Sequence, residues 1–129
     1  MCLFSKTPIP SIAQEDIICY KMFEINPLWN QLLITPYRLE AVNSKNFPFI
    51  FVASSGKCVI PVYDSYNNNI IYKIGPGFIH AYTHKISKNT ISPRYCIVLC
   101  KIYKGTKYYV SEYGKEICAS EMELIKIIK

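Results

Sequence analysis

Short apolar segments separated by turn-forming residues run through most of this chain. They span residues 16–25, 47–54, 57–63, 69–75, 78–86, 95–103 and 107–113, and they are rich in β-branched and aromatic residues, which favour strands. Gly, Pro, Asn or Ser separates most of them, at spacings of roughly 8–12 residues. The pattern predicts a mainly β fold, with α+β as the alternative. We expect one compact domain over residues 1–129, arranged as an antiparallel sheet or sandwich or as a small barrel.

Helical signals are few. Ser11 and Gln14 have the spacing of a capping box, which predicts about one helical turn near the N-terminus. Ser120 and Glu123 repeat that spacing in the tail, where the apolar positions fit either period. The isoleucines of this tail and its alternating Glu-Met-Glu-Leu favour a strand over residues 120–128. The fold should therefore contain at most two short helices.

Alternation along the expected strands also predicts which residues form the core. The apolar positions that we expect to be buried are Ile18, Phe51, Val59, Ile71, Ile97, Leu99 and Ile127.

The composition indicates an origin rather than a mechanism. Ile, Lys, Tyr and Asn, whose codons are AT-rich, number 20, 13, 11 and 8 in a chain of 129 residues. This bias is typical of phages and other mobile elements, and also of some free-living bacteria. No apolar run reaches the roughly 18 residues that a membrane span requires. The N-terminus shows no basic region followed by an apolar one. We therefore predict a cytoplasmic protein that does not bind a membrane, in the host cell if a phage encodes it.

The net charge of +6 raises nucleic-acid binding as an alternative function. Arginine is the residue best suited to bidentate phosphate and guanine contacts, and only Arg38 and Arg94 are present. The densest group of cations is Lys101, Lys104 and Lys107, which we treat as a candidate basic patch. Nucleic acid stays open as a partner on this ground.

Six cysteines lie mostly among Ile, Val and Leu, as in "RYCIVLCKI". Buried free thiols behave as small hydrophobic groups, so we expect these cysteines to be reduced and structural. There is no CxxC pair and hence no sequence support for structural zinc. No other cofactor is predicted.

The segment "IGPGFIHAYTH", residues 74–84, holds both histidines of the chain. Gly75-Pro76-Gly77 predicts a turn into a strand. On a strand His80 and His84 lie about 13 Å apart, too far to bind one metal, so no metal site is expected. Phe78, His80, Tyr82 and His84 should share one face, and Ile79, Ala81 and Thr83 the other. The first face is the better candidate wall of a groove or interface, which makes His80, Tyr82 and His84, together with Arg38, our candidate binding residues.

Two stretches carry a resemblance. "GFIHAYT" is similar to a "GIHFF-T" type of motif in uncharacterised phage and bacterial proteins, and residues 98–127 resemble the end of the same small module. The matching positions, within residues 77–129, are Gly77, Ile79, His80, Lys104 to Tyr108, Gly114 and Cys118 to Ser120. The chain departs from the pattern by one residue between Gly77 and the Ile-His pair, and by Tyr103 in place of a proline. The resemblance implies a β-rich module from phage or mobile DNA and no particular activity.

No catalytic residue is predicted, since the chain lacks a GxSxG elbow and any distinctive pair of carboxylates. "YKGT" at 103–106 resembles a segment of the ADP-ribosyltransferase fold, which implies an enzyme alternative using His80, Arg38 and either Glu116 or Glu121. The leading hypothesis is a non-catalytic interaction or accessory protein whose partner is a host or viral protein. Its oligomeric state stays open.

Overall fold

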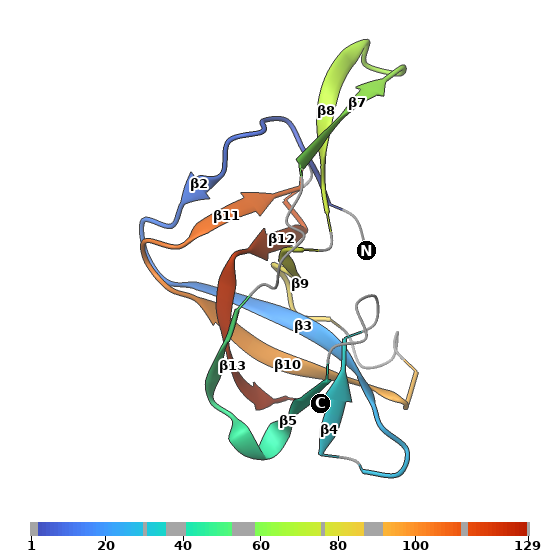
Figure 1. Ribbon diagram of the computed structural model, residues 1–129, viewed down its shortest axis with the longest axis vertical. Helices are drawn as coiled ribbons and strands as arrows, with labels where there is room; N and C mark the ends of the chain where they lie inside the picture. The colour runs from blue at the N-terminus through green and yellow to red at the C-terminus, as the bar shows by residue number, and fades with distance from the viewer. Residues whose placement is uncertain are drawn as a thin grey trace.

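The computed structural model describes residues 3–29, 31–35, 41–52, 59–75, 77–86, 92–111 and 114–128. These residues form strands and one short 3-10 helix, so the predicted mainly β fold is confirmed (Figure 1). The elements are β1 Leu3–Ser5, β2 Ser11–Ile12, β3 Ile17–Ile25, β4 Leu32–Ile34, β5 Ala41–Asn43, η1 Ser44–Asn46, β6 Phe49–Val52, β7 Val59–Asp64, β8 Asn69–Ile74, β9 Ile79–Tyr82, β10 Tyr95–Ile102, β11 Lys107–Val110, β12 Glu116–Ala119 and β13 Glu121–Ile127.

The strands make two antiparallel sheets. The larger sheet runs in the order β2-β11-β12-β9-β3-β10-β13-β6, with β4 added to β3 and β5 to β4. The smaller sheet has the order β1-β8-β7. Figure 1 shows the β7–β8 hairpin projecting away from the larger sheet, at the end of the molecule opposite β4 and β5. Both strand orders are open-ended among the described strands, so open sheets are the observed form of the predicted antiparallel architecture.

Most of the expected strands are present, with two informative differences. The tail forms strand β13, as its alternation predicted. The prediction of a helical turn from Ser11 and Gln14 is wrong, because Ser11 and Ile12 form β2 and pair with β11. The bonds Ala13 N–H to Thr106 O and Gly105 N–H to Ala13 O then continue this extended path. Pairing with a distant strand outweighs the local capping signal here.

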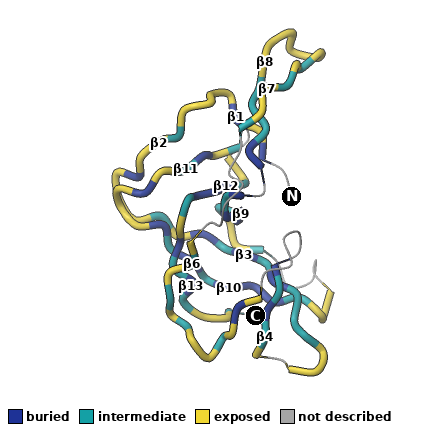
Figure 2. Tube along the Cα trace, in the orientation of Figure 1, coloured by how far each residue is buried: buried dark blue, intermediate teal, exposed yellow. Residues whose placement is uncertain are grey.

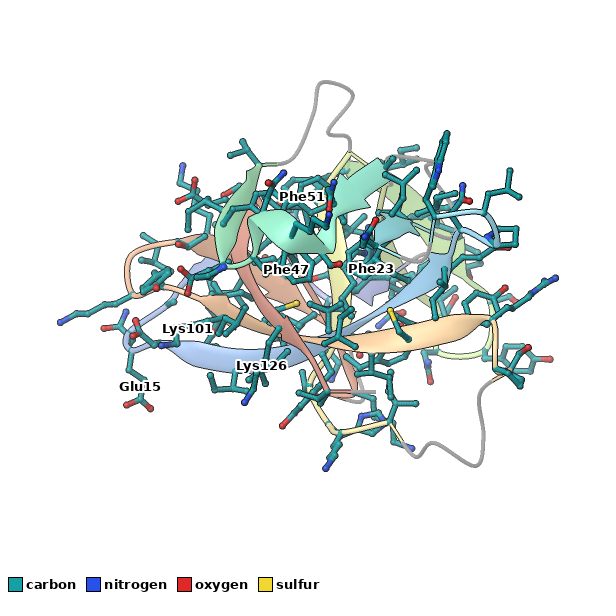
Figure 3. The ribbon with its side chains drawn as sticks, turned by 90° about the horizontal axis from the view of Figure 1, so that it is seen from below. Glu15, Phe23, Phe47, Phe51, Lys101 and Lys126 are labelled. Atoms are coloured by element: carbon teal, nitrogen blue, oxygen red, sulfur yellow. The ribbon has the colours of Figure 1, made fainter. Side chains whose placement is uncertain are left out.

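The main core lies on one face of the larger sheet, where alternate residues of its central strands meet. Cys100 of β10 stands directly opposite Cys19 of β3, and Cys96 opposite Phe23. The side chains of this cluster are Ala13, Cys19, Phe23, Leu33, Val42, Ile79, Ala81, Cys96, Val98, Cys100, Ile102, Ile117, Ala119, Met122 and Leu124. Phe47 and Phe51 pack on it, and Figure 3 shows both on the same side of the β3–β10 strands as Phe23.

A second, smaller core joins the two sheets. Leu3 of β1 and Ile74 of β8 are fully buried against Tyr109 of β11 and Cys118 of β12. The ring of Phe78 meets that of Tyr109 edge-on, with 5.6 Å between their centroids. The base of the hairpin is therefore anchored, while Figure 2 shows much of its outer part as exposed.

The expected core needs two corrections. Ile97 is buried, and Phe51, Val59, Ile71 and Leu99 are half-buried. Ile18 and Ile127, however, are 43% and 42% exposed. Ile18 lies on the face of β3 opposite Cys19, away from the main core. Ile127 lies at the end of β13, beyond the irregular register between Leu99 and Cys100.

The described cysteines, Cys19, Cys96, Cys100 and Cys118, are free and buried, whereas Cys2 and Cys58 lie outside the described residues. Burial raises the pKa of Cys96 to about 11 and that of Cys118 to about 12. The pKa of Cys100 is also raised, first by its hydrogen bond with Cys19 and then by burial. The raised pKa values keep the thiols of Cys96, Cys100 and Cys118 neutral at physiological pH, and all four buried cysteines behave as core residues.

Candidate binding pocket beneath the hairpin

One face of the hairpin forms the first wall of a pocket. Phe4 pairs with Lys73 of β8, and Asp64 pairs with Asn69. The two-residue period then places Phe4, Ile71 and Asp64 on the same face of the small sheet. All three line the pocket, and Phe4 and Ile71 are its apolar floor on this side.

The turn between β7 and β8 extends this wall. Asp64 accepts two hydrogen bonds through its carboxylate: Oδ1 from the backbone N–H of Tyr66 at 3.1 Å, and Oδ2 from the side-chain amide of Asn67 at 2.7 Å. Asn68 takes the left-handed conformation, with φ of 52°, that an Asn tolerates better than most residues. This folding brings Tyr66 and Asn67 to the rim of the pocket, where Tyr66 is 98% exposed.

The second wall comes from the end of β9 and the start of β12. The rings of Tyr82 and His84 stand nearly perpendicular, at 73°, with 5.9 Å between their centroids. Glu116 is the direct cross-strand neighbour of Tyr82. Lys115 is held beside them because the N–H of Thr83 donates to its carbonyl oxygen at 3.0 Å. Tyr82, His84, Lys115 and Glu116 all line the pocket.

Ser111 completes this wall and fixes the approach to β12. Its hydroxyl oxygen accepts a hydrogen bond from the N–H of Glu116 at 3.1 Å, and its own N–H donates to the carbonyl oxygen of Glu116 at 2.9 Å. Gly114, in the same turn, has a φ of 72°, a conformation that favours glycine. The open pocket between the two walls measures about 720 Å³. It combines aromatic rings, two carboxylates and one ammonium group.

His80 lies in the interior and not on this wall. It is 8% exposed, and its Nε2 lies 2.9 Å from the carbonyl oxygen of Gly75, so Nε2 carries a proton and donates it. The ammonium of Lys21 donates to the backbone oxygen of His80 at 2.7 Å. Gly75 O also accepts from the N–H of Phe78 at 3.4 Å, which supports the expected turn, although Pro76 lies outside the described residues. His80 therefore holds the segment that connects the two walls.

The candidate residues of the glycine-proline segment thus lie in different parts of the structure. The expected strand over 78–86 is shorter, because β9 ends at Tyr82 and His84 lies in a bend after it. Ile79 and Ala81 face the main core. Tyr82 and His84 reach the pocket, and Arg38 lies outside the described residues. Within the described part of the chain, no three His, Cys, Asp or Glu residues are grouped as metal ligands.

The candidate basic patch is mixed with acidic groups. Lys101 pairs in register with Glu123, and its ammonium lies 5.5 Å from the ring centre of Tyr103. The hydroxyl of Tyr103 donates to Glu123 at 2.8 Å, and this bond is the main reason that the pKa of Tyr103 is raised. The N–H of Lys104 donates to Asp16. Lys107 follows on β11 and is exposed.

Of the residues named for the enzyme alternative, Arg38 lies outside the described residues, and only one of the other three lines the pocket. Glu116 lines the pocket, Glu121 begins β13, and His80 is not part of the pocket lining. That alternative required a pocket that converges on His80.

Comparisons with protein-family models, with curated proteins and with solved structures find no match to this chain. None of the helical segments that the structure describes has the length and apolar character needed to cross a membrane. The further pocket residues that sequence reasoning missed are Phe4, Asp64, Tyr66, Asn67, Ile71, Ser111 and Lys115. They come from separate parts of the chain, and the run of asparagines near the hairpin turn was the one local signal among them.

Proposed function

We propose that this protein is a non-catalytic binding protein that captures a segment of a partner protein between the β7–β8 hairpin and the end of β9–β12. The observation that carries the proposal is the apolar character of a hairpin that stands clear of the larger sheet (Figures 1 and 2). Ile60, Tyr63, Tyr66 and Ile70 of this hairpin are between 48% and 98% exposed. Ile60 lies on the pocket face of the hairpin and Tyr66 in its turn, whereas the cross-strand pair Tyr63 and Ile70 lies on the opposite face. Exposed apolar side chains of this kind mark interaction sites, and tyrosine is enriched in protein interfaces.

The hairpin is better suited to binding through its faces than through its edge. β7 is the terminal strand of the small sheet, and such an edge invites an added strand from another chain. Pro61 lies in the middle of β7 and has no backbone N–H. Proline occurs in sheets where its nitrogen faces solvent, so the outer edge of β7 lacks a donor at its centre. The faces, with the pocket on one of them, remain as the recognition surface.

We propose further that the protein acts in the cytoplasm. The AT-rich codon bias of its composition supports a phage or mobile-element origin, in which case the partner is a host or viral protein.

The test is affinity capture from the producing cell with the wild-type protein and with Tyr66→Ala. The matched control is Leu28→Ala, because Leu28 is also a highly exposed apolar residue, at 83%, and lies between β3 and β4, far from the hairpin. A specific partner should be identified with wild type and with Leu28→Ala, and its recovery should fall at least about tenfold with Tyr66→Ala, as for an aromatic hot spot.

Equal recovery of that partner with Tyr66→Ala would refute the proposed surface. Recovery of nucleic acid alone, in a manner that added salt abolishes, would favour the nucleic-acid alternative instead.

A further inference from the structure

We propose that the pocket recognises a guanidinium group, presented by an arginine side chain of the partner segment. This inference rests on the proposed function and deepens it by giving the chemistry of the ligand. Three properties of the pocket lead to it: its rings, its charge balance and its size.

The rings offer faces for a planar cation. Phe4, Tyr66, Tyr82 and His84 contribute aromatic side chains from both walls. A cation within about 6 Å of a ring centre is attracted by the electron-rich face, and arginine does this more often than lysine. The Tyr82 and His84 rings already meet edge to face, so a flat cation stacks on a ring face that this contact does not cover. A guanidinium has this shape, with donors along its edge.

The charges of the pocket also favour a cation. Among the lining residues, carboxylates outnumber ammonium groups two to one, since Asp64 and Glu116 stand against Lys115. Glu116 is half-buried whereas Lys115 is exposed, so solvent and salt screen the ammonium more than the carboxylate. Lys73, the cross-strand neighbour of Phe4, lies on the same face of the small sheet but outside the lining.

The two carboxylates have different roles. Asp64 already accepts hydrogen bonds on both oxygens from the hairpin turn, which fixes its orientation. A carboxylate has about four acceptor positions, so capacity remains on each oxygen. Glu116 is held through its backbone by Ser111, and its side chain stands beside Tyr82. An arginine stacked on Tyr82 therefore meets Glu116 as its natural bidentate partner.

The size of the pocket argues for an arginine on a chain. A volume of about 720 Å³ lies within the roughly 300–1,000 Å³ typical of ligand sites, which is far more than a guanidinium occupies. The remaining space suits the aliphatic stem of the arginine and its neighbouring residues, against Phe4 and Ile71.

The test uses pentapeptides of the form acetyl-Gly-Ser-X-Ser-Gly-amide, with X as arginine, citrulline, lysine or glutamate, and free arginine amide as a separate arm. Binding is followed by amide chemical shifts in NMR spectra of the full chain.

The arginine peptide should shift the resonances of Tyr82, His84 and Glu116 at millimolar concentrations or below. Citrulline keeps the size of arginine and removes its charge, and this should weaken binding at least about tenfold. Stronger binding by the peptide than by arginine amide would assign the site to a chain and not to a free metabolite.

Glu116→Gln should weaken binding of the arginine peptide about three- to tenfold, and the matched control Glu15→Gln, at an exposed carboxylate near Asp16 (Figure 3), should leave it unchanged. Equal binding of the arginine and citrulline peptides, tighter binding of the glutamate peptide, or no binding of any peptide would overturn the guanidinium assignment.

These outcomes are separable from the proposed function itself. If no peptide binds but Tyr66→Ala still releases the captured partner, the hairpin surface stands and the ligand chemistry is wrong. If Tyr66→Ala has no effect and the arginine peptide binds, the pocket is a ligand site unrelated to the captured protein.

Discussion

The central strands and the β7–β8 hairpin are composed of similar apolar residues, but the central strands are mostly buried and the hairpin is mostly exposed. "YCIVLCKI" of β10 and "VIPVYD" of β7 both consist largely of residues that favour strands. In β10 most of these side chains are buried because β3 and β13 flank it and residues from other strands of the larger sheet, including β6, pack into the same core. In the hairpin only the base packs, against the second core. Strand propensity thus favours the same conformation in both regions, and the presence of packing partners decides burial.

The largest contrast should appear when an aromatic ring is removed from each region. Phe23→Ala deletes a fully buried ring of the main core and should lower the free energy of unfolding by about 3–5 kcal/mol. Tyr66→Ala removes a ring that is almost fully exposed and should change it by less than about 0.5 kcal/mol. Urea denaturation followed by circular dichroism measures both. Comparable losses for the two variants would show that the hairpin tip is packed.

His80 connects the two regions, and its replacement should have an intermediate effect. His80→Ala removes the hydrogen bond from Nε2 to Gly75 O inside the protein, which leaves the carbonyl with one partner fewer and should cost about 1–3 kcal/mol. His84→Ala is the matched control, because His84 is exposed, and should cost less than about 0.5 kcal/mol. A loss of partner binding with unchanged stability in His80→Ala would instead identify His80 as a contact residue.

The buried thiols should make the stability of the folded protein sensitive to alkaline pH. In the unfolded chain a thiol ionises near its ordinary pKa of 9.0, while the folded state keeps the pKa of Cys96 at about 11 and of Cys118 at about 12. Above pH 9 the unfolded state therefore binds fewer protons than the folded state, and stability falls as the pH rises toward 12. The midpoint of urea denaturation, measured between pH 7 and pH 10.5, follows this loss of stability. The midpoint of the comparison variant Cys118→Ala should fall less steeply with pH than that of the wild type.

The same thiols should resist chemical labelling. An Ellman-type reagent should react with Cys19, Cys96, Cys100 and Cys118 only after denaturation, since all four are buried and reaction requires an accessible thiolate. Rapid reaction of more than two thiols in the native protein would contradict their burial, because only Cys2 and Cys58 lie outside the described residues.

The smallest expected effect is at the outer part of the hairpin. Ile70→Thr keeps a β-branched residue at a position that is 55% exposed and should change the free energy of unfolding by less than about 0.5 kcal/mol. Ile74, four residues further along the same strand, is fully buried. Ile74→Thr should lower the free energy of unfolding distinctly more than Ile70→Thr, because it places a hydroxyl in the second core. Equal midpoints for the two variants would remove the distinction between the tip and the base.

The sequence predicts the long strands well because their signal is local. β3 and β10 carry enough β-branched and aromatic residues to be recognised without knowledge of their partners, whereas the apolar positions of β13 fit a helix as well as a strand. The two-residue strand β2 cannot be recognised in this way, since Ser11 and Ile12 are extended only because Tyr108 and Lys107 lie opposite them. Ile18 shows a related limit: alternation separates the two faces of a strand but does not say which face is covered.

The pocket could be predicted only in part. Tyr82 and His84 could be identified as candidates from the sequence because one short segment contains both aromatic and titratable rings. Asp64 and Tyr66 offered no such signal, because their turn meets Tyr82 only through the pairing of β1 with β8 and the packing of the second core. Their arrival at one site is a property of the topology.

Lys21 places an ammonium within a largely apolar face, above the ring of Phe23 and against the carbonyl oxygen of His80. That acceptor belongs to the main chain, and every amino acid supplies one. Random substitution at position 80 can therefore remove the imidazole while the ammonium keeps this bond, whereas substitution at position 21 removes it outright. Among descendants that keep this fold, this bond should therefore persist through changes at position 80 and disappear with changes at position 21.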